Sequence, residues 1–127
     1  MAIISLSFPE QMIKEMDQLQ KSQGFTGRSE LVRAAIRLML EDNRKKDSLI
    51  GPVSAIVTVT HNQENEEPIT RLKHEFENIV KTHIHSKIKP GNCLELFIVE
   101  GEGKRVAAMT KAFQKEAQMK SVQLIVL

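Results

Sequence analysis

Three histidines and a cysteine in the second half of this sequence are the side chains best suited to chemistry: His74, His83, His85 and Cys93. Imidazole nitrogen and thiolate sulfur together are ligands for nickel, copper, cobalt or zinc, whereas magnesium and calcium prefer oxygen. We find no Ser/His/Asp set or acid/base pair, and Gly101-Glu102-Gly103 is interpreted as a strand-to-helix turn rather than a phosphate-binding loop. These residues predict a transition-metal site in a protein that is not an enzyme.

The first of the histidines, His74, belongs to a helix that the sequence predicts from Pro68 onward. The apolar positions of this helix recur at helical spacing: Ile69, Leu72, Phe76, Ile79 and Val80. His74 lies two residues from both Leu72 and Phe76. Its side chain is therefore expected to point away from the apolar face.

The other two histidines belong to a strand expected over residues 82–88. Successive side chains of a strand alternate between its two faces, and the apolar Ile84 and Ile88 are expected to face the core. The opposite face then carries His83, His85 and Lys87. Cys93 begins the next strand after a four-residue turn, which brings it close to that face. The alternative is a group of ordinary surface residues, with Cys93 simply half-buried.

The second half as a whole patterns as a folded domain in which strands and helices alternate. Strands are expected at 53–60, 82–88, 93–99 and 122–127, and helices from Pro68 and around Val106, Met109 and Phe113. The order βαββαβ is typical of the ferredoxin-like arrangement, an antiparallel sheet with both helices on one face. The predicted fold class is therefore α+β.

The first half has a different pattern, a short strand followed by two helices. Residues 3–8 alternate, with Ile4, Leu6 and Phe8 on one face and Ile3, Ser5 and Ser7 on the other. One helix follows Pro9 and stops at Gly24, and a second begins near Gly27 and ends around residue 41. This unit is too small to bury its own apolar faces, so we expect a dimer whose two strands pair across a two-fold axis.

These motifs carry a resemblance over nearly the whole chain. Residues 4–8 followed by Gly24-Phe25-x-x-Arg28-Ser29-Glu30 resemble the ribbon-helix-helix domain of the CopG/Arc/MetJ superfamily. Cys93-Leu94-Glu95 after a histidine-bearing strand resembles the ACT-like domain of the nickel-responsive NikR family. The implied organisation is a DNA-binding domain over 1–45, a linker over 46–52 and a ligand-sensing domain over 53–127.

The resemblance implies that the strand of the first half reads DNA in the major groove through one face, which carries Ile3, Ser5 and Ser7. Serine hydroxyls meet either donor or acceptor edges of bases. Arg28 and Ser29 lie at the start of the second helix, where free backbone N–H groups and the helix dipole favour a phosphate. The expected partner is a double-stranded DNA operator.

The same resemblance implies how the metal is bound. The family uses one histidine from a neighbouring subunit, a His-x-His pair on a strand and a cysteine on the next strand. Counting back from Cys93 without a gap, His85 and His74 match, but Lys87 stands where the second strand histidine belongs. With a longer turn, His83 and His85 form the pair instead. Nickel is the implied metal, with copper, cobalt or zinc as other candidates.

Bulk properties agree with a cytoplasmic regulator. The net charge of +2 is too small to indicate nucleic acid by itself. There is no apolar run of about 18 residues and no signal peptide, so no membrane role is expected. We therefore predict a homotetramer, built as a dimer of dimers, that regulates transcription in response to metal. The alternatives are the same architecture sensing a small molecule such as an amino acid, or an antitoxin that wraps a toxin.

Overall fold

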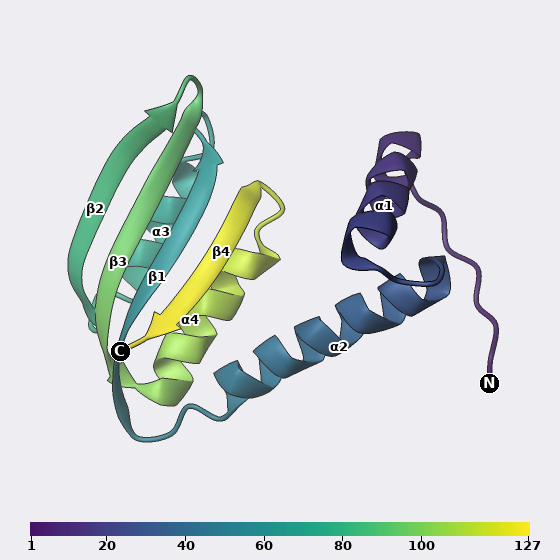
Figure 1. Cartoon of the computed structure of the whole chain (residues 1–127). Coiled ribbons are helices and arrows are strands. Elements are labelled where there is room, and N and C mark those ends of the chain that lie inside the picture. The colour runs from purple at the N-terminus through teal and green to yellow at the C-terminus, as the bar shows by residue number, and fades with distance from the viewer. The chain divides into compact units, whose positions relative to one another are not determined.

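The chain folds into two compact units, Met1–Lys45 and Lys46–Leu127. The structure is a computed structural model that describes all 127 residues. Figure 1 shows two helices in the first unit and a sheet with two helices in the second. No helix of the chain is both long and apolar enough to cross a membrane.

The first unit consists of α1, Glu10–Gln23, and all but the last two residues of α2, Arg28–Asp47, preceded by an extended segment (Figure 1). The stop predicted at Gly24 is confirmed: this glycine has a φ of 76°, and its N–H donates to the Lys21 carbonyl oxygen at 3.3 Å. The end predicted near residue 41 is wrong, because α2 continues to Asp47. Arg, Lys and Glu are good helix formers, so the charged segment extends the helix.

The strand expected at residues 3–8 is absent from a single chain. Ile3 and Ile4 are 96% and 77% exposed, so neither face of the segment is covered. A lone strand has no backbone partner, and its hydrogen bonds must come from another chain. The unpaired segment is what we expect of one copy of a ribbon that two copies form together.

The second unit has the predicted order βαββαβ and is ferredoxin-like. Its elements are β1 (Pro52–Asn62), α3 (Glu67–Glu75), β2 (Val80–Lys89), β3 (Asn92–Glu102), α4 (Gly103–Lys115) and β4 (Met119–Val126). The strands form one antiparallel sheet in the order β2-β3-β1-β4. Figure 1 shows α3 and α4 on the same face of this sheet, as predicted.

The core lies between the sheet and its two helices. Its buried side chains come from alternate positions of β1 and β3 and from both helices: Ala55, Val57, Val59, Phe97, Val99, Ile69, Leu72, Val106, Met109 and Phe113. The other face of the sheet, which we call the open face, has no helix over it. It carries the apolar side chains Ile56, Ile84, Leu94, Leu96, Ile98 and Ile125.

The expected orientation of β2 is wrong. Ile84 and Ile88 are 51% and 49% exposed rather than in the core. The register of the sheet explains this, because His83 pairs with Phe97 and His85 pairs with Glu95, and both β3 partners lie on the helix-covered face. With a period of two, the intervening Ile84 must lie on the open face. The histidines of β2 therefore point toward the helices.

The turn predicted at Gly101-Glu102-Gly103 is confirmed, since β3 ends at Glu102 and α4 begins at Gly103. A Cβ on Gly101 would lie 2.5 Å from Cγ2 of Ile79. A Cβ on Gly103 would lie 2.6 Å from the backbone carbon of Leu49. These glycines permit close packing between segments.

Candidate metal centre and DNA-binding surface

Three adjacent strands bring the candidate ligands together at one end of the helix-covered face. On β3, Cys93 and Glu95 occupy alternate buried positions. Cys93 pairs with His61 on β1 and with Lys87 on β2. Glu95 pairs with His85 on β2. Because these partners share one face of the sheet, their side chains meet although they come from distant parts of the chain.

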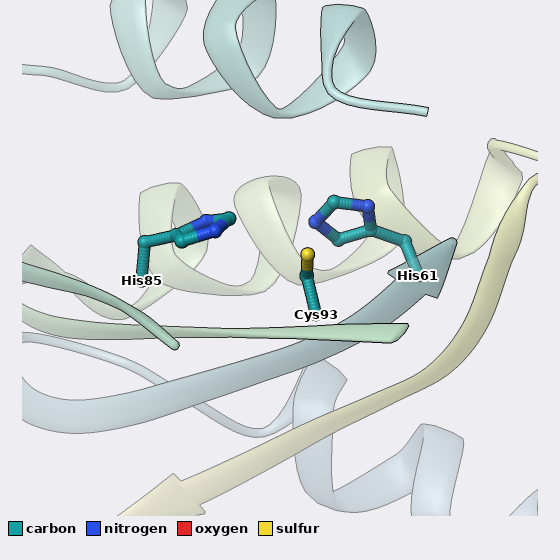
Figure 2. A group of neighbouring side chains, drawn as sticks. All are labelled: His61, His85 and Cys93. Carbon is teal, nitrogen blue, oxygen red and sulfur yellow. The ribbon is translucent and has the colours of Figure 1, made fainter. Parts of the chain in front are cut away.

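Figure 2 shows His61 and His85 with their rings on either side of the Cys93 sulfur. One ligand atom from each of the three residues lies within 4.8 Å of the other two. His61 and Cys93 are fully buried, whereas His85 is 39% exposed on its side chain. Two imidazoles and a thiolate suit nickel, copper, cobalt or zinc, so the donor set fits the metal class that the sequence predicts.

A buried carboxylate holds the histidines in place. Glu95 is 1% exposed, and its Oε2 lies 2.8 Å from Nε2 of His61 and 2.5 Å from Nδ1 of His85. Its Oε1 lies 2.7 Å from Nε2 of His83. A buried carboxylate requires such hydrogen bonds, because burial without partners costs several kcal/mol. Glu95 therefore orients three imidazoles at once.

His61 is oriented from its other side as well. Its Nδ1 lies 2.6 Å from the carbonyl oxygen of Asn62. A carbonyl oxygen only accepts hydrogen bonds, so Nδ1 is the nitrogen that carries a proton and donates. Nε2 is then the nitrogen open to a metal, which would displace the proton that Nε2 shares with the Glu95 carboxylate 2.8 Å away.

Of the four predicted ligands, the structure brings two together in this group and leaves two outside it. His85 and Cys93 lie in the group just described. His83 is outside it, half-buried and stacked on Phe97 with ring centroids 4.4 Å apart and planes 12° apart. His74, on α3, is 82% exposed with its Nδ1 3.5 Å from a Glu77 carboxylate oxygen, and it lies apart from the other ligands of its own chain.

Two residues of this group, His61 and Glu95, had no predicted role in the metal site. Both continue a buried alternation: His61 follows Val57 and Val59 on the covered face of β1, and Glu95 lies between Cys93 and Phe97 on β3. A charged or polar residue in phase with a run of buried apolar residues is the signal that identifies them.

On the first unit, the residues predicted to bind phosphate lie at the start of α2. Nε and Nη2 of Arg28 each lie 2.9 Å from a different carboxylate oxygen of Asp17. The hydrogen bond from Arg28 lowers the pKa of Asp17, and the hydrogen bond to Asp17 raises that of Arg28. Asp17 thus fixes the guanidinium beside Ser29, with one nitrogen still free for another partner.

The first turn of α2 is capped from within. Glu30 accepts hydrogen bonds from the Thr26 hydroxyl and from the Thr26 backbone N–H, the latter at 2.9 Å. These bonds lower the pKa of the Glu30 carboxyl, the hydroxyl contributing most.

The side chains predicted to read DNA bases, those of Ile3, Ser5 and Ser7, are all exposed.

The fold and the group of ligands define the class of protein: a DNA-binding ribbon-helix-helix unit joined to a metal-sensing unit, that is, a metal-responsive transcription regulator. The family model described as NikR C terminal nickel binding domain matches residues 54–127. The model described as ribbon-helix-helix protein, copG family, matches residues 2–42. This chain belongs to the NikR family of regulators.

Three curated relatives match most of this chain. A protein of Haloarcula marismortui is 33% identical over all of this chain and 94% of its own length, and its description is "Putative nickel-responsive regulator". Proteins of Halobacterium salinarum and Methanocaldococcus jannaschii with the same description are 36% and 29% identical, over 80% and 98% of this chain and 73% and 90% of their own lengths.

Among solved structures, an uncharacterized protein of Thermotoga maritima matches with a TM-score of 0.56 at 10% sequence identity. The match covers 61% of this chain and 99% of that chain. At this identity the match speaks for the fold alone.

Proposed function

We propose that this protein regulates transcription in the cytoplasm by binding an operator in response to nickel, and that it catalyses no reaction. One observation supports this proposal above all. The imidazoles of His61 and His85 lie beside the Cys93 thiol, in a domain that matches the nickel-binding family. The test is DNA affinity measured with and without nickel on the intact protein. Nickel should change the operator affinity at least tenfold, and an unchanged affinity would reject the nickel response.

The nickel ligands that we propose are His85 and Cys93 of one chain and His74 of a neighbouring copy, with His83 as the fourth candidate. The exposure of His74 on α3 supports a role toward another chain, since its side chain is available on the surface. Nickel held by these residues would link two chains at this point. The proposed coupling is that this link favours one spacing of the two DNA-binding dimers over another.

The proposed assembly is a dimer of dimers, and two uncovered apolar surfaces support it. The first is a hollow of about 560 Å³ on the first unit, lined by apolar side chains that include Ile4, Leu6, Phe8, Ile13, Met16 and Ile36. The second is the open face of the sheet. Apolar surfaces of this kind mark interfaces, and two different surfaces are enough to build a tetramer.

Leu96→Glu should split the tetramer. Leu96 is half-buried on the open face, on β3 between Thr58 of β1 and Ile84 of β2. A carboxylate there would be buried without a partner in a face-to-face contact. Native mass measurement should find four chains for the wild type and two for the variant. Ser54→Glu, at an exposed position of the same face, is the matched control and should leave four chains. Four chains in the Leu96 variant would place the interface elsewhere.

Arg28→Ala should weaken DNA binding about equally for all sequences. Loss of one phosphate contact lowers the slope of log affinity against log salt by roughly one unit. Ser5→Ala and Ser7→Ala should instead change sequence preference, since the ribbon reads base edges. Titrations of operator and unrelated DNA at several salt concentrations separate the two effects, with Lys115→Ala on α4 as a control cation. A change of preference in Arg28→Ala, with none in the serine variants, would refute the ribbon assignment.

A further inference from the structure

We propose that His61 on β1 is a nickel ligand of this chain and takes the ligand position that Lys87 on β2 cannot fill. This inference rests on the proposed function, because it concerns the same nickel centre. It assigns to His83 a different task, which is to hold Glu95.

The sheet register places His61 next to Cys93. Cys93 has two cross-strand neighbours, Lys87 on β2 and His61 on β1. A lysine ammonium group has three N–H donors and no lone pair, so it offers nothing to a metal. His61 lies directly across from the thiol on the other side and is fully buried there. The imidazole missing from one neighbouring strand is thus present on the other.

The distances between the three ligand atoms are close to those of a metal site. Ligand atoms bound to one metal at about 2.0–2.3 Å lie at most about 4.5 Å apart. The ligand atoms of His61, His85 and Cys93 already lie within 4.8 Å of one another. Small side-chain rotations would therefore bring all three to bonding distance, provided that the Glu95 carboxylate moves off Nε2 of His61.

The hydrogen bonds of the His61 and His85 rings are those expected of metal ligands. A histidine that binds a metal usually donates its second N–H to a carbonyl or carboxylate. His61 has this arrangement through Nδ1 and the Asn62 carbonyl, and His85 has it through Nδ1 and Glu95. Nε2 of His61 also lies 2.8 Å from Glu95, and a metal at this nitrogen would replace that contact. Glu95 would then keep its hydrogen bonds with His83 and His85.

The position of His83 favours a supporting role over a ligand role. Its ring is stacked on Phe97, and its Nε2 is engaged with Oε1 of Glu95. It is therefore a positioning residue, which fixes the carboxylate that fixes His85. The three ligands of one chain come from β1, β2 and β3, and they are assembled before a neighbouring copy supplies His74.

The test is the number of imidazoles bound to nickel, measured by X-ray absorption on the intact protein together with nickel affinity. His61→Ala should lose one imidazole and bind nickel at least tenfold more weakly. His83→Ala should keep the imidazole count, although loss of an outer hydrogen bond also lowers affinity by about 10–100-fold. The double variant His61→Ala with Lys87→His should regain the lost imidazole. His61→Gln, closer in volume, covers the case in which His61→Ala does not fold, and it should also lose one imidazole.

Two other outcomes are distinguishable. If both His61 variants keep the wild-type imidazole count while His83→Ala loses one, the assignment of His61 is overturned and the nickel response stands. If the wild type binds no nickel, the proposed function fails and this inference fails with it.

Discussion

Cys93→Ser is expected to abolish the thiolate-to-nickel charge-transfer absorption and to weaken nickel binding by about two orders of magnitude or more, roughly 3 kcal/mol. Cys93 is the only cysteine of the chain, so no other thiolate can replace it. It is also fully buried between His61 and Lys87, where a serine side chain of similar shape fits. A serine hydroxyl keeps its proton near neutral pH and is a poor ligand for nickel.

The readouts are absorption during nickel titration and operator affinity with and without nickel. The variant should keep the far-ultraviolet circular dichroism and the oligomeric mass of the wild type, because the change removes a ligand and hardly alters packing. Nickel should no longer change its DNA affinity. A variant that binds nickel as the wild type does would contradict the metal site, and a small molecule at the ACT-like domain would become the better candidate for the effector.

The second large effect is expected at Phe97. Phe97→Ala should lower the free energy of unfolding of the second unit by about 3–5 kcal/mol, which is the usual cost of truncating a fully buried phenylalanine. Its ring is 0% exposed, with its centroid 5.5 Å from that of Phe113 and 4.4 Å from that of the His83 ring. The cavity would therefore open directly beside the side chain that holds Glu95.

Denaturant unfolding with and without nickel measures this effect, since a ligand that binds the folded state adds to its stability. Phe97→Leu is the matched control, because leucine fills most of the space that the phenylalanine ring occupies. It should lower the free energy of unfolding by about 1–1.5 kcal/mol, and it still removes the ring stacked on His83. If both variants bind nickel with the wild-type affinity, the contact between Phe97 and His83 has no influence on the metal centre. A loss below about 1 kcal/mol in Phe97→Ala would contradict the close packing of this core.

The order of elements followed from the sequence because local patterns decide it. Alternation in β1 and β3, helical spacing around Leu72 and Met109, and the glycine stop at Gly24 each depend on neighbouring residues alone. The two helices of the first unit were also predicted from local motifs, since Pro9 precedes α1 and Gly24 ends it. The extension of α2 to Asp47 was missed, because a charged run without a Gly or Pro stop has no local signal for its end.

The composition of the metal centre depended on the sheet. Alternation in β2 showed two faces but not which one the helices cover. The register with β3 decided this, because Ile84 pairs with Leu96 of the open face. His61 precedes Glu95 by 34 residues, and no local pattern joins them. The spacing within β2 and β3 was enough to predict that His85 and Cys93 lie close together. The pairing of β1 with β3 decided that His61 lies beside them, because register across strands is a long-range property that only the folded sheet sets.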